Sequence, residues 1–177
     1  VLGDAADRAV HERAASVARG LAPLAGWVNN AGITKRTPLH ALDERVVREI
    51  LDINGFGYLW GCSAAVSAFV DQGIAGAIVN IGSIHGRASF VDHAAYEFTK
   101  GGIDALSRSV AVTYGALGIR ANTVAPGGVR TPHLEAQIAA LPSAGRDRNA
   151  VEMTAPRLRI STPTSSSPLV PPFMPMM

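Results

Sequence analysis

The sequence predicts an α/β protein built on a doubly wound parallel sheet that is incomplete at both ends of the chain. Short apolar runs alternate with longer stretches whose apolar residues recur at helical spacing. Strands that are separated by whole helices need crossover connections, and strands joined in this way pair in parallel. The apolar runs also end in turns that contain Gly, Asn or Pro, which marks the expected strand ends.

The first half of the chain supplies two helices and one strand. A helix is predicted from Asp7 to Leu21, because apolar side chains recur along one face and a glycine closes the pattern. A buried strand at Trp27–Asn29 follows and ends in a turn. A second helix is predicted from Leu42 to about Val70. Near its middle Asn54 stands beside Gly55, and because both are poor helix formers a local break costs little there.

The second half repeats the alternation. The β-branched run Ala77–Ile81 lies between two glycines and predicts a strand. Asp92 is expected to cap a long helix that reaches about Leu117, where Gly118 ends it. A last strand is predicted at about Ile119–Val124, just before a Pro-Gly-Gly turn.

Composition excludes several classes of protein. The 177 residues, 47% apolar and 17% charged, suffice for one domain with a sizeable core. A net charge of +2 with both signs interspersed argues against nucleic acid, and we expect no membrane span or secretory signal. The lone Cys62 excludes an intramolecular disulfide and is expected to be a packing residue. The histidines share no ligand spacing, so no metal is expected. These features favour a cytoplasmic protein, and the Arg-, Ala- and Gly-rich usage favours a bacterial source.

Both ends look unlike those of a complete domain. The chain starts at Val1, and its first predicted element is a helix that should follow a strand. The residues from Ser161 to Met177 carry no charge and are rich in Pro, Ser and Met. The segment 151–177 is therefore interpreted as an atypical tail that is either disordered or translated out of frame, and the sequence leaves both alternatives open.

Two apparent motifs, a phosphate-binding loop and a nucleophile elbow, are excluded by the residues around them. Three glycines between Gly55 and Gly61 are spaced like those of a phosphate loop, but such a loop must leave a strand and open a helix. These glycines lie inside a helical pattern, so we expect them to serve packing. Around Ser83 the spacing of a nucleophile elbow fails by one residue, which leaves a serine hydrolase as a distant alternative.

Tyr96 and Lys100 form the more informative pair. Four residues apart on one predicted helix, their side chains share a face about 6 Å apart. At an effective dielectric of ~20 the ammonium favours the phenolate by about 2–3 kcal/mol. That attraction would lower the phenol's pKa toward the range in which it can exchange protons at neutral pH.

Polar residues follow the ends of the three predicted strands. Ser83 closes one strand, the Asn30–Gly32 turn closes the strand before it, and Pro126–Gly127 closes the strand after it. The carboxyl ends of parallel strands form the ligand crevice of such a sheet. We therefore expect the serine hydroxyl to lie beside Tyr96.

On these motifs the chain resembles the short-chain dehydrogenase/reductase family over roughly residues 3 to 135. The motifs are N-N-A-G at Asn29 to Gly32, Asn54 in the following helix, Ser83, Y-x-x-x-K at Tyr96 and Lys100, and P-G-x-x-x-T at Pro126 to Thr131. Gly3-Asp4 is similar to the family's strand-end Asp. The resemblance implies a Rossmann-like fold and NAD or NADP as the cofactor.

The resemblance also implies a role for each matched residue. Tyr96 would be the general acid/base, Lys100 would lower its pKa and hold the nicotinamide ribose, and Ser83 would bind the substrate oxygen. Asn54 would anchor a water that relays protons toward the lysine. The implied cofactor-binding residues are Asp4, Asn30, Ala31, Gly32, Tyr96, Lys100, Pro126, Gly127, Val129 and Thr131. His85, Phe90 and His93 are interpreted either as lining the substrate pocket or as loop-surface residues.

The chain departs from the family pattern at both ends. The family's T-G-x-x-x-G-x-G phosphate loop and the residue that selects NAD or NADP would lie upstream of Val1, and the family's last helix and strand are missing downstream. Residues 1–150 are thus expected to form a partial NAD(P)-binding domain. In the family's strand order, the first strand would sit beside the strand ending at Asn29.

The sequence thus predicts an NAD(P)-dependent oxidoreductase that interconverts a secondary alcohol and a ketone by hydride transfer. The alternative is a catalytically silent fragment of a dinucleotide-binding fold. The expected partners are a small-molecule alcohol or ketone and, for the complete protein, further copies of the chain in a homodimer or homotetramer. The particular substrate cannot be deduced from the sequence.

Overall fold

The three predicted strands form one parallel sheet. The structure, a computed structural model, describes residues 1–129 and residue 139. The strands β1 (Gly26–Asn29), β2 (Gly76–Ile81) and β3 (Ile119–Val124) pair in the order β1-β2-β3. Asn29 lies opposite an asparagine of β2, and the last residues of β2 and β3 also face each other, so the carboxyl ends meet at one edge. The predicted parallel arrangement is confirmed.

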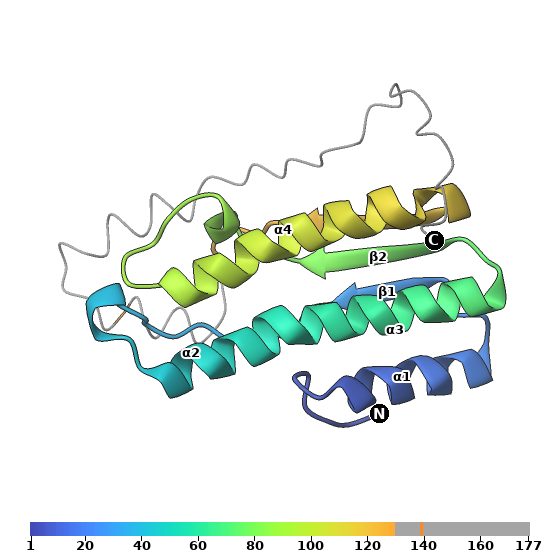
Figure 1. The fold of residues 1–177 in the computed structure, drawn as a ribbon, viewed down its shortest axis with the longest axis horizontal. Coiled ribbons are helices and arrows are strands. Elements are labelled where there is room, and N and C mark those ends of the chain that lie inside the picture. Colours follow the sequence, from blue (N-terminus) through green and yellow to red (C-terminus); the bar gives the residue numbers. More distant parts are fainter. Residues whose placement is uncertain (130–138, 140–177) are drawn as a thin grey trace, which may run out of the picture.

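Three long helices lie on one face of this sheet (Figure 1). Helix α1 (Arg8–Leu21) packs beside α3 (Gly57–Gln72), α3 contacts β1 and β2, and α4 (Ala94–Tyr114) contacts β3. The Asp7 carboxylate accepts the N–H of Ala9 and so caps α1. The first predicted helix is therefore confirmed, and the structure shows Asp7 as its N-cap.

The second predicted helix is continuous but contains a π turn. Helix α2 (Glu44–Ile50) passes through the π segment Leu51–Phe56 into α3. The Gly57 N–H bonds to the carbonyl five residues back, at Asp52. The sequence indicates that a break would cost little at Asn54; the structure has no break there but a π turn that contains this residue. By length and composition the whole helix could cross a membrane, but more than half of its apolar window is buried against the rest of the chain, as in a core helix.

The N-terminus of α4 differs from the prediction. Asp92 does not cap it: this residue has a φ of 61°, its carboxylate pairs with Arg36, and the N-cap position is His93. A threonine far away in the sequence provides the acceptor instead, because the Thr37 hydroxyl accepts the N–H of Ala95 at 3.1 Å. The Thr37 N–H also donates to the Asp92 carbonyl, which ties the segment after β1 to the start of α4.

The core lies between the sheet and the helices. Phe69 and Ile78 are fully buried there, and Cys62 packs against them as a buried free thiol, as predicted. Gly57 permits a close approach, since a Cβ there would lie 2.7 Å from the Ala5 carbonyl oxygen. The interpretation of the helical glycines as packing residues is thus confirmed at this position.

The opposite face of the sheet is open in the described part of the chain. Val28 on β1 is 63% exposed there, and Arg120 and Asn122 on β3 are exposed as well. Strand β1 is an edge strand among the described residues. Gly3 and Asp4, expected at a strand end, are not in a strand; the Asp4 carboxylate instead accepts the Ala6 N–H in a turn.

Candidate active site

Helix α4 places Tyr96 and Lys100 together, as their spacing predicts. The lysine Nζ lies 5.6 Å from the centre of the Tyr96 ring. The two side chains come from the first two turns of α4, whose N-terminus is held by Thr37. The predicted shared face is therefore present, at the carboxyl end of the sheet beside the end of β2.

Lys100 is buried, with 4% of its surface exposed. Its Nζ donates to the Ile81 carbonyl at 2.9 Å and to the Tyr58 hydroxyl at 3.5 Å. Burial removes water from the ammonium and lowers the lysine pKa to about 8. The ammonium therefore loses its proton close to physiological pH rather than far above it.

Tyr58 is a site residue that the sequence analysis does not identify. It lies on α3, is 1% exposed, and donates its hydroxyl hydrogen to the Ile81 carbonyl at 2.7 Å. The Lys100 Nζ also lies 5.2 Å from the centre of its ring. Burial, and then the neighbouring Tyr96, raise the pKa of the Tyr58 phenol well above its ordinary value. This phenol therefore stays protonated and neutral.

Asn54 lies fully buried in the π segment. Its Oδ1 accepts the Ile33 N–H at 2.9 Å and its Nδ2 donates to the Ile33 carbonyl at 2.8 Å. This pair of bonds holds the turn after β1. A Cβ on Gly32 would lie 3.3 Å from the Asn54 Oδ1 and 3.7 Å from the Lys100 Nζ. The backbone thus passes close to both side chains, and Asn54 and Lys100 face the same small space.

Ser83 lies just beyond the end of β2, at the start of a short 3₁₀ turn, Ile84–Gly86. Its Oγ accepts the His85 N–H at 3.1 Å. The turn packs closely on α4, because a Cβ on Gly86 would lie 2.9 Å from the Lys100 carbonyl oxygen. The His85 ring is 6.5 Å from the Tyr96 ring. The Ser83 segment and Tyr96 are therefore neighbours, in line with the expectation.

Three rings continue from Tyr96 along the loop before α4. The Phe90 ring lies 5.3 Å from that of His85 and 4.8 Å from that of His93. Both imidazoles have Nδ1 beside a backbone carbonyl, at 3.0 and 2.7 Å. Because a carbonyl only accepts, Nδ1 carries the hydrogen in each ring and Nε2 is the acceptor in the neutral form. The rings form one row next to the catalytic candidates.

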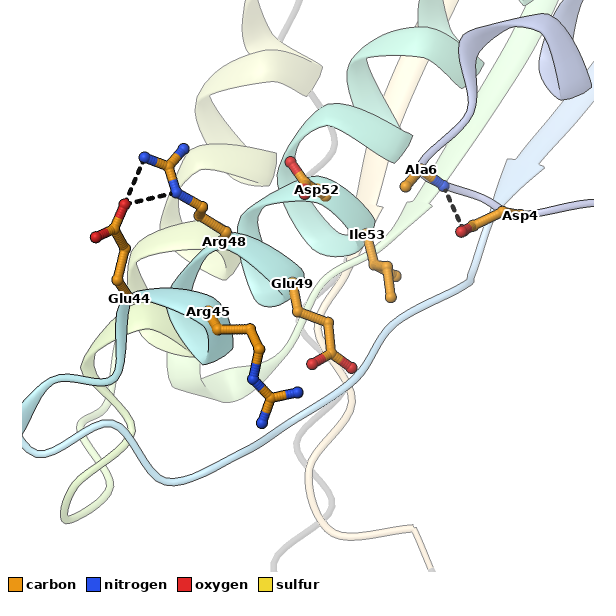
Figure 2. Close-up of a pocket in the computed structure, with 8 residues that line it drawn as sticks. All are labelled: Asp4, Ala6, Glu44, Arg45, Arg48, Glu49, Asp52 and Ile53. Carbon is orange, nitrogen blue, oxygen red and sulfur yellow. Dashed lines mark hydrogen bonds and ion pairs between the residues drawn. The ribbon is translucent and has the colours of Figure 1, made fainter.

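Three of the four expected adenosine-side residues border two separate cavities. Asn30 and Ala31 line a cavity of about 110 Å³ together with Ala5 and Tyr58. Asp4 lines a larger one of about 680 Å³, bordered mostly by charged side chains of the π segment and α2 (Figure 2). None of the four catalytic candidates borders this larger cavity.

The turn after β3 reaches the same edge of the sheet. The Pro126 carbonyl accepts the Ile84 N–H at 3.0 Å, which joins it to the turn that follows Ser83. Gly127 and Val129 are exposed. Thr131 lies outside the described residues. Two of the three strand-end motifs of the sequence analysis therefore lie wholly within the described residues, and the third is described only from Pro126 to Val129.

A parallel sheet with a Tyr–Lys pair at its carboxyl edge defines an α/β protein of the dinucleotide-binding class. The chain belongs to the short chain dehydrogenase family: the family model matches residues 1–141. The members of this family are oxidoreductases, and the predicted family resemblance is confirmed.

The relatives are enzymes of this class. The chain is 35% identical over 106 residues to 3beta-hydroxysteroid dehydrogenase 1 of Eggerthella lenta, a match that covers 60% of this chain and 41% of that protein. It is similar in structure to 4-hydroxyisoleucine dehydrogenase complexed with NADH, with a TM-score of 0.69, 27% identity, and 78% of this chain and 61% of that one covered. The gluconate 5-dehydrogenase from Burkholderia cenocepacia in complex with NADP and tartrate gives a TM-score of 0.74, 27% identity, and coverage of 82% and 56%.

These likenesses confirm the Rossmann-like fold class. The chain spans 41% of the length of the hydroxysteroid dehydrogenase and 56–61% of the two solved structures. The three relatives are named for a steroid, a hydroxylated amino acid and a sugar acid, so their names do not converge on one substrate.

Proposed function

We propose that the protein is an NAD(P)-dependent oxidoreductase that interconverts a secondary alcohol and a ketone, with Tyr96 as the general acid/base. The observation that carries the proposal is the placement of the Lys100 ammonium between two phenol rings and the end of β2. A small-molecule substrate would meet Tyr96 at the sheet edge that also carries Ser83. The proposed location is cytoplasmic, and the proposed assembly is a homodimer or homotetramer.

The residues present fit the nucleoside ends of NAD or NADP. The Gly32 backbone lies close to the polar ends of Asn54 and Lys100, so hydrogen-bonding groups gather where the ribose would lie. Lys100 and Tyr96 would hold the nicotinamide ribose; Pro126, Gly127, Val129 and Thr131 would hold the carboxamide side. Asp4, Asn30, Ala31 and Gly32 would hold the adenosine side. When bound, the nicotinamide supplies the site that accepts or donates the hydride.

Proton transfer in this mechanism belongs to Tyr96. For alcohol oxidation the phenolate takes the hydroxyl proton, and for ketone reduction the phenol returns it to the carbonyl oxygen. Lys100 would support this transfer, because its Nζ lies 5.6 Å from the centre of the Tyr96 ring. Ser83 would donate its hydroxyl hydrogen to the substrate oxygen and so orient it. Asn54 would anchor a water on the lysine side.

The proposal is tested in the full-length protein by following NADH or NADPH absorbance with a panel of secondary alcohols and ketones. Tyr96→Phe removes the exchangeable proton but keeps the ring, so we expect kcat to fall by several orders of magnitude while cofactor affinity is largely retained. Lys100→Ala should lower both turnover and cofactor affinity, since its ammonium would serve both groups. Near-normal turnover by Tyr96→Phe would exclude the assignment of the acid/base.

A second candidate is a catalytically silent dinucleotide-binding fold. The 177 residues contain no T-G-x-x-x-G-x-G loop, whose backbone N–H groups would cradle the pyrophosphate, so cofactor binding by these residues is the property to measure. Titration of the 177-residue chain with NADH and NADPH separates the two. Micromolar affinity for NADH or NADPH would favour the oxidoreductase, because the 177 residues would then bind the cofactor by themselves. No detectable binding would favour the catalytically silent fold.

A further inference from the structure

We propose that Tyr58 is a positioning residue for Lys100: its hydroxyl oxygen and its ring hold the lysine side chain in the charged form between β2 and Tyr96. The proposal rests on the proposed function, because it deepens the role given there to Lys100. Tyr58 itself is 1% exposed and so is not placed to touch a substrate. It would act through the lysine.

Both side chains converge on one backbone carbonyl. The Ile81 oxygen accepts from the Tyr58 hydroxyl at 2.7 Å and from the Lys100 Nζ at 2.9 Å. A phenol has one hydrogen, and this one is directed at the carbonyl. The Tyr58 oxygen therefore presents only lone pairs to the Lys100 Nζ, which lies 3.5 Å away. A hydrogen-bond acceptor in this position stabilises the charged ammonium form of Lys100 more than the neutral amine form, because the amine's lone pair needs a donor and finds none in Tyr58.

The ring of Tyr58 supports the same charge. The Lys100 Nζ lies 5.2 Å from the centre of this ring and 5.6 Å from the centre of the Tyr96 ring. Both distances fall within the range of a cation–π interaction. One ring comes from α3 and the other from α4. The Lys100 Nζ meets Tyr58 at its hydroxyl end, because it lies closer to the Tyr58 oxygen, at 3.5 Å, than to the ring centre. The two rings and this oxygen replace part of the water that burial removes.

No carboxylate compensates the ammonium within the described residues, where Lys100 forms no ion pair. The groups around it are the Tyr96 phenol on α4, the neutral Asn54 amide on the π segment, the Ile81 carbonyl on β2 and Tyr58 on α3, behind which lies the Cys62 thiol. None of these neighbours carries a negative charge while the phenols and the thiol keep their protons. The dipoles of the Tyr58 hydroxyl and the Ile81 carbonyl therefore provide much of the stabilisation of the Lys100 ammonium. Loss of one of them should be measurable.

The test is a pH titration of Lys100 followed by NMR with lysine labelled with ¹³C at Cε. Lys35 and Lys100 are the only lysines of the 177 residues, so Lys35→Arg and Lys100→Arg assign the two signals. Tyr58→Phe keeps the ring and its packing and leaves the Ile81 carbonyl with its lysine donor. We expect it to lower the Lys100 midpoint by about 0.5–1 pH unit, a threefold to tenfold change in acid dissociation. Tyr114→Phe, a partly buried tyrosine at the other end of α4, should leave the midpoint unchanged.

An unchanged or raised Lys100 midpoint in Tyr58→Phe would overturn the proposal. The second measurement is the dependence of kcat/KM on pH. On the alkaline side kcat/KM should fall as Lys100 loses its proton. This fall should move to lower pH in Tyr58→Phe and should not move in Tyr114→Phe. An unmoved fall in an active Tyr58→Phe enzyme also overturns the proposal. If the protein shows no alcohol–ketone activity, the proposed function fails, while the NMR titration still decides whether Tyr58 holds the lysine charge.

Discussion

Asn29 and Asn80 are register partners on β1 and β2, and their side-chain amides bond to each other at 2.8 Å. From Asn80 the hydrogen bonds continue to the Ser107 Oγ at 2.9 Å, and from there to the Thr123 Oγ1 on β3 at 2.7 Å. This side-chain ladder joins all three strands and α4 just beneath the strand ends. It aligns the residues from which the site is built.

The ladder predicts that Asn80 contributes strongly to stability. Asn80→Ala would remove the bonds that Asn80 makes with the buried Asn29 and Ser107 side chains and leave a cavity in their place, so we expect a loss of about 2–3 kcal/mol in the free energy of unfolding. Asn122→Ala, an exposed asparagine on β3, is the control and should change it by less than about 0.5 kcal/mol. Urea unfolding followed by circular dichroism measures both. Equal effects of the two substitutions would contradict the prediction.

Thr37 is predicted to position Tyr96 through the first turn of α4. Thr37→Val keeps the shape but leaves the Ala95 N–H without its acceptor, which should cost about 1–2 kcal/mol. Because Tyr96 is the next residue, kcat should fall by more than cofactor affinity. Thr37→Ser restores the hydroxyl and should restore both stability and kcat. A Ser variant as impaired as the Val variant would show that the hydroxyl is not the reason.

The buried lysine predicts a rise of stability with pH. Since burial lowers the pKa of Lys100 to about 8 in the folded chain, the unfolded chain holds this proton more tightly between that value and the usual lysine value near 10.5. Folding releases a proton in this window, so the free energy of unfolding should rise as pH increases through it. Lys100→Met should lack this rise, and Lys35→Met, at a half-exposed lysine paired with Glu49, should retain it. Denaturant unfolding at a series of pH values gives the comparison.

An apolar stripe on α4 predicts self-association. Phe98, Ala105 and Val112 are spaced seven residues apart and exposed, Phe98 by 74% and Val112 by 84%. A second copy of the same helix would cover this stripe. We expect light scattering of the full-length protein to show a dimer or tetramer, and Val112→Glu to shift it to smaller species. Val17→Glu, an exposed valine on α1, is the control and should not. A monodisperse monomer at the outset would refute the prediction.

Local patterns account for most of what the sequence predicts correctly. The three strands, the first helix and the Tyr96–Lys100 face depend on spacing within a few residues, which a sequence displays directly. The irregularity of the helix around Asn54 was also indicated, because helix propensity is a local property. Its form as a π turn was not, since that depends on how the two helix halves pack on their separate neighbours.

The errors arise where distant residues decide the outcome. Asp92 has the right chemistry for a helix cap, but Thr37, far away in the sequence, provides the acceptor, and Asp92 turns to Arg36 instead. Tyr58 carries no local signal either, because its partner Lys100 lies 42 residues away in the sequence. Contacts of this kind follow from the packing of α3 and α4 on the same sheet, where the Tyr58 and Lys100 side chains both reach the Ile81 carbonyl, and no single stretch of sequence records that packing.

The π segment Leu51–Phe56 determines in which direction around the helix axis the side chains of α3 point. A π turn contains one more residue than an α turn, and each residue rotates an α-helix by about 100°. Deletion of one residue there would restore a regular helix but swing Tyr58, Cys62 and Phe69 out of the core-facing sector. A substitution can be absorbed within this helix, whereas a one-residue length change cannot. Insertions and deletions in this protein should therefore be confined to the connections between elements.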